Sequence, residues 1–160
     1  MAGTLFTIGA VQIFIAAEDH PPPHVHAWHP GEGWRARFRF SYLSDVAGLY
    51  GVRTVNRRPR ARVLTTIVGA FIDNIVLCRS AWWETHGMRS GLGLVNRRLE
   101  MRDGSRGIQV RVALLSQPNA IAITSAGYDP PSQLVRLVLA DGRRLSLVAG
   151  EHIEEAEEWS

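Results

Sequence analysis

The chain has 160 residues, 46% of them apolar, which is enough to bury a core in one domain or in two small ones. Its single cysteine, Cys78, excludes an internal disulfide framework and favours a reducing cytoplasm. The longest apolar run, residues 63–78, is interrupted by Asp73 and is shorter than the ~20 apolar residues of a transmembrane helix, so we expect no membrane span.

Arginine supplies all the basic charge, and its distribution is uneven. The net charge is +3, from 18 basic and 15 acidic residues. Residues 53–111 hold twelve arginines and four acids, whereas residues 112–160 hold three arginines and seven acids. A basic middle and an acidic end predict either a polyanionic partner or docking of the two charged regions on each other.

The first third of the chain reads as β-structure. Residues 4–8 and 11–17 are rich in β-forming side chains around Gly9 and predict a hairpin. Residues 34–40 alternate strictly, with aromatic residues or alanine on one face and arginine on the other, which predicts a strand. Residues 41–58 are polar and are predicted to be a connection.

One long helix is predicted after Pro59, which suits a first helical turn. Apolar residues recur in adjacent pairs every four positions from residue 63 to residue 76 and give a broad apolar face. Trp82 and Trp83 extend this face, and Gly87 is the expected C-cap. Gly69 or Ser80 is the expected place of any bend.

The rest of the chain predicts a module of β-hairpins. Residues 92–101 and 108–115 flank one Asp-Gly turn, residues 133–139 and 144–148 flank another, and residues 120–125 form a further strand. Residues 151–159 are acidic and predict a terminal helix. The predicted class is α+β: an antiparallel β-meander packed on one long helix in residues 1–87, followed by a hairpin-rich module in residues 88–160.

A histidine-rich stretch, residues 18–29, carries four of the six histidines. Residues 21–23 are prolines and form a stiff extended bridge. On a strand after this bridge His24 and His26 share one face, so we expect His20, His24 and His26 to converge within ~5 Å. Imidazoles beside carboxylates suit Zn²⁺, Ni²⁺ or Fe²⁺. The candidate ligands are His20, His24, His26, His29, Asp19 and Glu32.

Other interpretations of this stretch stay open. The same groups suit a proton relay, or a structural turn in which Asp19 and His20 brace the proline bridge. A histidine-triad hydrolase fits poorly because the third histidine follows His26 by three residues, across Trp28. A cupin fits poorly because five residues, not three or four, separate His26 from Glu32.

Arginines form the second candidate site. Four of them crowd the predicted helix N-terminus, where cations are mildly unfavourable and where an anion could bind between them and the free amides. The arginine face of the strand at residues 34–40 could continue this surface as a groove for a phosphate backbone. The candidate polyanion-binding residues are Arg35, Arg37, Arg39, Arg57, Arg58, Arg60 and Arg62.

Residues 4–87 resemble the bacterial domain-of-unknown-function 4160 family. The resemblance rests on an Asp-His pair, consecutive prolines and a His-Val-His element, and the residues at these motif positions are Asp19, His20, Pro22, Pro23, His24 and His26. Residues 134–147 more weakly resemble the domain-of-unknown-function 2442 family through their hairpin pattern. The resemblance implies no assigned reaction, and it implies an arrangement like that of a toxin–antitoxin pair.

These observations predict a cytoplasmic bacterial protein, a toxin–antitoxin-like or regulatory module that contacts RNA or a partner protein through its arginines. One alternative is a metal-dependent enzyme that uses the histidine stretch, and another is a structural accessory subunit of a larger assembly. The acidic tail, residues 151–160, is expected to lie against an arginine-rich surface.

Overall fold

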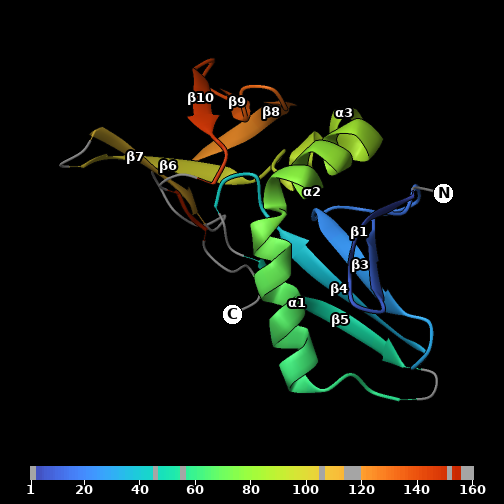
Figure 1. Cartoon of the computed structure of the whole chain (residues 1–160). Helices are drawn as coiled ribbons and strands as arrows, with labels where there is room; N and C mark the ends of the chain where they lie inside the picture. Colours follow the sequence, from blue (N-terminus) through green and yellow to red (C-terminus); the bar gives the residue numbers. More distant parts are fainter. Residues whose placement is uncertain are drawn as a thin grey trace. The chain divides into compact units, whose positions relative to one another are not determined.

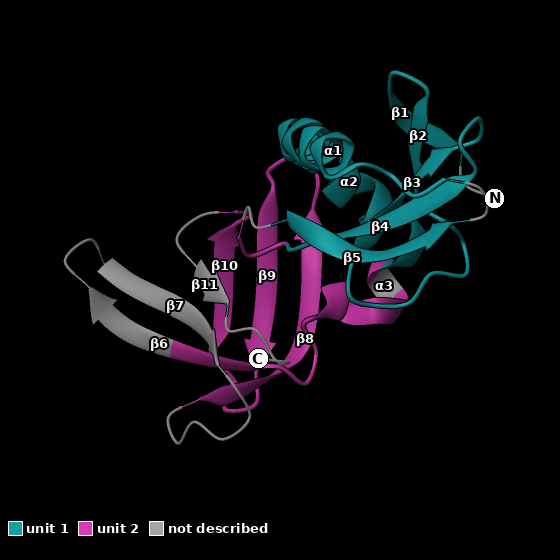
Figure 2. Ribbon diagram, turned by 90° about the horizontal axis from the view of Figure 1, so that it is seen from below, with its two compact units in different colours: residues 1–41, 45–86 teal, residues 42–44, 87–160 magenta. Residues whose placement is uncertain are grey.

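A computed structural model describes residues 3–44, 47–54, 57–104, 107–113, 120–150 and 153–155. The chain forms two compact units, the first made of residues 1–41 and 45–86 and the second of residues 42–44 and 87–160 (Figure 2). The sequence predicts a division after residue 87. The structure divides the chain between residues 86 and 87 and also assigns residues 42–44 to the second unit.

The first unit is built on a five-stranded antiparallel sheet in which every strand pairs with the next one along the chain (Figure 1). This is the meander that the sequence predicts. Its strands are β1 (Thr4–Ile8), β2 (Val11–Phe14), β3 (His24–His29), β4 (Trp34–Phe40) and β5 (Ala47–Thr54). Strand β5 corrects the prediction of a plain connection over residues 41–58, because pairing with β4 supplies the order that the local sequence does not show.

Strand β4 shows why the sheet has two different faces. Trp34, Ala36, Phe38 and Phe40 are buried, and the arginines between them are exposed or half-buried. Directly opposed residues in an antiparallel pair share a face, so the arginines lie on the same face as alternate residues of β3. The cross-strand pairs on this face are His24–Arg39, His26–Arg37 and Trp28–Arg35.

Two helices, α1 (Ala61–Asp73) and α2 (Ile75–Trp82), replace the single long helix of the prediction. They pack on the buried side of the sheet, where Phe71 and Trp82 contact the Phe40 ring. The axes of residues 61–73 and 75–87 differ by 74°. The bend lies at Asn74, not at Gly69 or Ser80, because the Asn74 side chain donates to the Ala70 carbonyl at 2.8 Å and closes the first helix.

The helical segment also ends later than predicted. A π-helical turn, η1 (Trp83–Gly87), and a short helix, α3 (Met88–Ser90), follow α2. Gly87 keeps helical dihedral angles, and Gly91 is the C-cap with φ +57°. A Cβ at residue 91 would lie 2.3 Å from Val95 Cγ2, so this left-handed cap requires glycine. A 3₁₀ turn, η2 (Gly91–Gly93), follows.

The second unit contains a six-stranded sheet of order β10-β9-β8-β6-β7-β11. The turn at Asp141 and Gly142 joins β9 to β10 as predicted, with Gly142 at φ +88°. The other hairpin differs from the prediction: β6 begins at Arg98 and not at residue 92, because residues 91–93 form η2, and it continues through the predicted turn residues 103 and 104, which pair with β7. Tyr42 packs its ring on Tyr128 inside this unit. The strands are β6 (Arg98–Gly104), β7 (Gly107–Ala113), β8 (Ile121–Asp129), β9 (Leu134–Leu139), β10 (Arg144–Val148) and β11 (Ile153–Glu155).

The predicted terminal helix is wrong where the structure describes the chain end. Residues 153–155 form β11, which pairs in parallel with β7 from Val110 to Val112. Strand pairing at a sheet edge here outweighs the local helical preference of a glutamate-rich segment. Residues 151, 152 and 156–160, and with them most of the predicted docking of the acidic tail, lie outside the described residues.

Within the described part of the chain, no single helix has both the length and the apolar character needed to cross a membrane. The bent pair formed by residues 61–73 and 75–87 meets that test only when its halves are taken together.

Candidate metal centre

A tight turn after β2 places the carboxylate of Asp19. The backbone N–H of Asp19 donates to the carbonyl of Ala16 at 3.2 Å. In return the N–H of Ala16 donates to Asp19 Oδ2 at 2.8 Å. Two hydrogen bonds between the same two residues fix both the backbone and the side chain of Asp19, so its second oxygen points at the start of β3.

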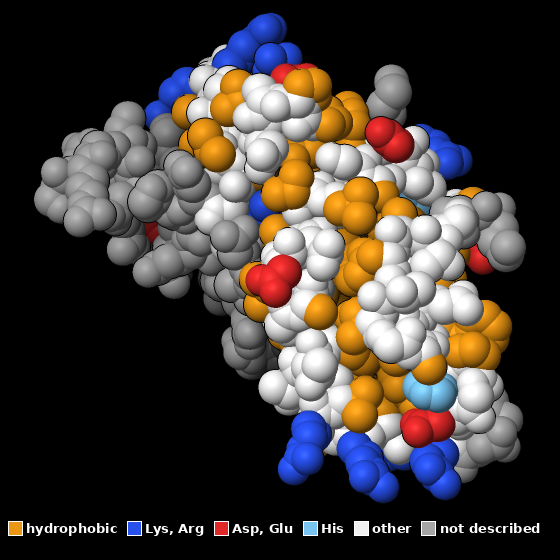
Figure 3. All heavy atoms as spheres, in the orientation of Figure 1, with side chains coloured by type: hydrophobic (Ala, Val, Ile, Leu, Met, Phe, Trp, Pro, Cys, Tyr) orange, Lys and Arg blue, Asp and Glu red, His pale blue; other side chains and the backbone are white. Residues whose placement is uncertain are grey.

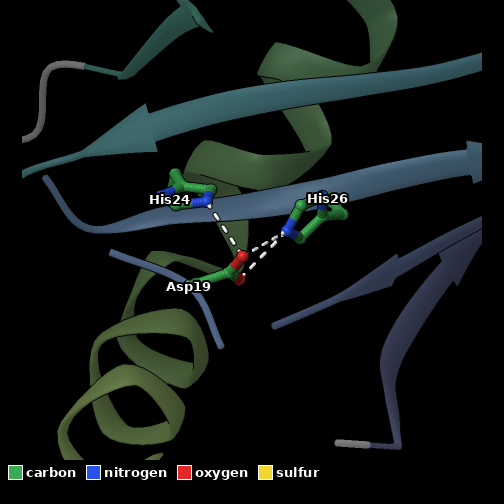
Figure 4. Close-up of side chains that lie close together, drawn as sticks. All are labelled: Asp19, His24 and His26. Carbon is green, nitrogen blue, oxygen red and sulfur yellow. Dashed lines mark hydrogen bonds and ion pairs between the residues drawn. The ribbon is translucent and has the colours of Figure 1, made fainter. Parts of the chain in front are cut away.

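Asp19, His24 and His26 form a compact group, which we name the Asp–His cluster (Figure 4). The His26 Nε2 atom lies 2.8 Å from Asp19 Oδ1 and 3.0 Å from Oδ2. The His24 Nε2 atom lies 3.4 Å from Asp19 Oδ1. One potential ligand atom from each residue lies within 4.8 Å of the other two. The two histidines therefore meet as the period of a strand predicts.

Aromatic packing holds both imidazole rings in place. The His26 ring stacks on Phe14 of the neighbouring strand, with centroids 5.0 Å apart and planes 14° apart. The His24 ring lies 5.4 Å from the Trp82 ring and 5.7 Å from the Tyr50 ring. The side chains of Asp19, His24 and His26 are 9%, 5% and 11% exposed. The Asp–His cluster is therefore a preorganised and largely dehydrated group of polar atoms.

The hydrogen bonds of His24 determine its tautomer. Its Nδ1 atom lies 2.9 Å from the carbonyl oxygen of Pro22, which can only accept, so Nδ1 donates and carries the proton. In the neutral ring Nε2 then has a lone pair, and this lone pair faces Asp19 Oδ1. A cation bound by both atoms, either a proton or a metal ion, would stabilise this arrangement.

Protons are disfavoured at both of these atoms. Burial lowers the pKa of His24 below 6.5, with further lowering by the charges of His26 and Arg37, although the Pro22 carbonyl and Asp19 oppose this. Burial alone would raise the pKa of Asp19, but hydrogen bonds from His26 and the Ala16 N–H, together with the histidine charges, lower it below 3.8. A neutral imidazole thus faces an ionised carboxylate at pH 7.

His86 supports the cluster from the π-helical turn that continues α2. Its Nε2 atom donates to the carbonyl of Ala16 at 2.8 Å, the same residue whose N–H holds Asp19. Its ring also packs on Trp82, with centroids 4.5 Å apart. Sequence reasoning missed His86 because it lies 57 residues beyond the end of the histidine-rich stretch. Its spacing of four from Trp82, which places both on one helix face, was the available signal.

The other three predicted ligands do not join the cluster. His20 is exposed and is not part of the group. His29 and Glu32 instead build the turn between β3 and β4. His29 Nδ1 accepts from the Glu32 backbone N–H at 2.9 Å, and the Glu32 carboxylate accepts from Trp34 Nε1 at 2.9 Å. The convergence predicted for three histidines therefore holds for His24 and His26, with Asp19 as the third member.

The predicted polyanion-binding arginines lie in two separate places. Arg57, Arg58, Arg60 and Arg62 are exposed around the start of α1, where Figure 3 shows basic side chains gathered. The first turn of α1 contains no acidic residue to offset them. The others, Arg35, Arg37 and Arg39, are on strand β4.

Cys78 takes no part in chemistry. It is fully buried in α2, and burial raises the pKa of its thiol to about 12. A thiol that stays protonated at neutral pH is a poor nucleophile and a poor metal ligand, so Cys78 is best described as a small buried core residue.

Comparison of the chain with protein-family models, with curated proteins and with solved structures gives no match. The resemblance to the domain-of-unknown-function 4160 and 2442 families therefore stays a prediction.

Proposed function

We propose that this protein binds a divalent transition-metal ion through Asp19, His24 and His26. One observation carries the proposal: the lone pair of His24 Nε2 faces the Asp19 carboxylate at 3.4 Å while the other nitrogen of the ring is already used as a donor. A metal ion between these atoms would turn a repulsive contact into two coordinate bonds.

The spacing of the donor atoms fits this ion. Ligand atoms bound at ~2.1 Å, at tetrahedral or octahedral angles, lie roughly 3.0 to 3.4 Å apart. The pairs Asp19–His24 and Asp19–His26 are 3.4 and 2.8 Å apart, and the ligand atoms of all three residues lie within 4.8 Å of one another, so a metal would need side-chain rotations that bring the two imidazoles together. Two imidazoles and one carboxylate are suited to Zn²⁺, Fe²⁺ or Ni²⁺, as predicted from the sequence.

Groups around the cluster have the arrangement found around metal ligands. A ligating histidine commonly donates its second N–H to a carbonyl, which fixes its orientation, and His24 does so to Pro22. The carboxylate of Asp19 accepts from the Ala16 N–H in the same manner. These outer contacts favour a site that is formed before the metal arrives.

Three protein ligands leave at least one coordination position for water or substrate, as in catalytic rather than structural zinc sites. A metal held in this way supplies a Lewis acid and a bound water of lowered pKa. This supports the metal-dependent enzyme among the functions predicted from the sequence. His24 and Asp19 orient the site, and the rings of Phe14 and Trp82 exclude bulk water from it.

Metal content of untagged protein, measured by mass spectrometry after purification without chelator, tests the proposal. We expect about one ion of zinc, iron or nickel per wild-type chain. Asp19→Asn and His26→Gln should each lower metal affinity at least ~10-fold, because each removes a ligand. His20→Gln is the matched control, since it removes a histidine of the same stretch that lies outside the cluster.

Two results would overturn the proposal. One is wild-type protein that stays metal-free after incubation with each of the three ions. The other is equal loss of metal from His20→Gln and His26→Gln, since a site that depends on both would not be the one described by Asp19, His24 and His26.

A further inference from the structure

Aromatic and basic side chains alternate on the face of the first sheet that carries the arginines of β4. The β3–β4 pairing places Trp28 beside Arg35 and His26 beside Arg37. The β2–β3 pairing adds Phe14 beside His26, and Tyr50 comes from β5. We name this surface the arginine–aromatic face and define it by Phe14, Trp28, Arg35, Arg37 and Tyr50.

Guanidinium groups and rings on this face are in direct contact. The Arg35 guanidinium lies 5.4 Å from the Phe14 centroid and 5.9 Å from that of Trp28. The Arg37 guanidinium lies 4.7 Å from the Tyr50 centroid. Gly51 leaves room for it, because a Cβ there would approach Arg37 to 3.0 Å. These cation–π contacts hold long side chains flat across the sheet, so they are ordered before any ligand binds.

The rings nevertheless remain accessible. Trp28 is 36% exposed and Tyr50 is 39% exposed, which is unusual for side chains of this size. Arg35 and Arg53, which lie opposite each other on β4 and β5, are also exposed. Strands β1 to β5 contain neither aspartate nor glutamate within their described residues. These strands therefore give the face only positive charge, Asp19 adds one carboxylate at His24 and His26, and the rings of Trp28 and Tyr50 are partly exposed to water.

We propose that the arginine–aromatic face binds single-stranded nucleic acid. Bases would stack on Trp28, Tyr50 and the planar guanidinium groups, and the phosphates would lie between Arg35, Arg37 and Arg53. Charge complementarity supplies the attraction, because the arginines of β4 and β5 have no acidic residue between them along these strands and suit an evenly spaced polyanion. The rings supply what charge alone does not, which is preference for unpaired bases.

A single strand suits this surface better than a duplex does. Stacked and paired bases in a duplex cannot lie on protein rings. The proposal goes beyond metal binding and does not depend on it. The two surfaces adjoin, however, because His26 stacks on Phe14 and Tyr50 packs beside His24.

Fluorescence anisotropy with a labelled single-stranded oligonucleotide of about 20 nucleotides tests the inference on the full chain, first treated with chelator. We expect binding that weakens steeply as salt rises from about 0.05 to 0.5 M. Trp28→Ala should weaken binding about 5- to 100-fold without changing the salt slope, because it removes a stacking ring and no charge. Trp28→Phe, which keeps a ring, should retain most of the affinity.

Charge is tested by Arg35→Gln, which should reduce the slope of log affinity against log salt by about 1. Its matched control is Arg144→Gln, an exposed arginine of β10 in the second unit, which should leave both affinity and slope nearly unchanged. The inference is overturned if the oligonucleotide does not bind at the lowest salt, which is the result expected if the face binds a protein instead. It is also overturned if a duplex of equal length binds as tightly, or if the two arginine variants behave alike. Failure of these oligonucleotide-binding experiments would not contradict the metal-content result, and absence of metal would not contradict nucleic-acid binding.

Discussion

Asp19 is placed by backbone geometry, and its position determines what the two histidines face. The hydrogen bonds between Asp19 and Ala16 orient the carboxylate, and the hydrogen bond from His86 connects Ala16 to the helical segment. The carboxylate then contacts His26 at 2.8 Å and His24 at 3.4 Å. The cluster thus depends on contacts that span 70 residues of sequence, although its three members lie within eight.

The depressed pKa of His24 makes the stability of the metal-free protein depend on pH. Unfolded His24 binds a proton near pH 6.5, while the buried ring binds one only at lower pH. Below pH 6.5 the unfolded state therefore holds more protons, and the free energy of unfolding should fall as pH falls toward the folded pKa. We expect His24→Gln to show a smaller loss between about pH 7.5 and 5.5 than wild type, in urea titrations with chelator present.

His20→Gln serves as the control for this experiment, because it removes an exposed histidine of the same stretch that lies outside the Asp–His cluster. A wild-type curve that is flat across this range, or a His24→Gln curve identical to it, would contradict the assigned burial of the His24 ring.

The sequence alone predicts some, but not all, of the residues that form the Asp–His cluster. The two-residue spacing of His24 and His26 identifies both, because a strand puts alternate side chains on one face. His20 and His29 carry the same chemistry but lie outside the alternating pair, in the connection before β3 and at the end of β3. The choice of Asp19 over Glu32 depends on the turn at Ala16, which no spacing rule reveals.

Strand β4 is the element whose form follows most directly from its sequence. Its alternation of apolar residues with arginine is realised as a buried face and an exposed one. Strand β5 was missed because residues 47–54 contain two glycines and no clear alternation, and the β4 edge supplies its order. The bend at Asn74 was missed for a similar reason: an asparagine in a helical pattern signals a break only when its side chain meets the backbone.

Two glycines in the helical region should respond to alanine with opposite signs. Gly69 lies inside α1, and a Cβ added there would meet no heavy atom within 4 Å, so Gly69→Ala should raise the free energy of unfolding by ~0.5 to 1 kcal/mol. Gly91 has φ +57° and would place a Cβ 2.3 Å from Val95 Cγ2, so Gly91→Ala should lower it by ~1 to 3 kcal/mol. Thermal unfolding followed by circular dichroism measures both.

Each glycine variant is the other's control, since both add one methyl group to a glycine. Equal shifts in the same direction would show that Gly91 is not a left-handed C-cap and that the helical segment ends elsewhere.

At the scale of the whole molecule, the second unit includes a short segment from the first half of the chain. Residues 42–44 belong to it, although residues 41 and 45 on either side belong to the first unit. Tyr42 is 1% exposed, its ring packs on Tyr128 with centroids 4.9 Å apart, and its carbonyl accepts from the Gly150 N–H. The sequence suggests two modules that meet end to end. It does not reveal that residues 42–44 belong to the second unit, because residues 41–44 carry no periodic pattern.

Because residues 42–44 belong to the second unit, we expect a fragment of residues 87–160 to be less stable than the same residues in the intact chain. In the full chain, Tyr42→Ala removes a buried ring and should lower the free energy of unfolding by about 3 kcal/mol. Tyr50→Ala removes a ring of the same type that is 39% exposed, so it should lower the free energy of unfolding by less, about 1 kcal/mol. Limited proteolysis, with cleavage sites mapped by mass spectrometry, should show Tyr42→Ala opening the second unit first. If residues 87–160 alone resist protease as well as the full chain does, the Tyr42 segment is not part of that unit's core.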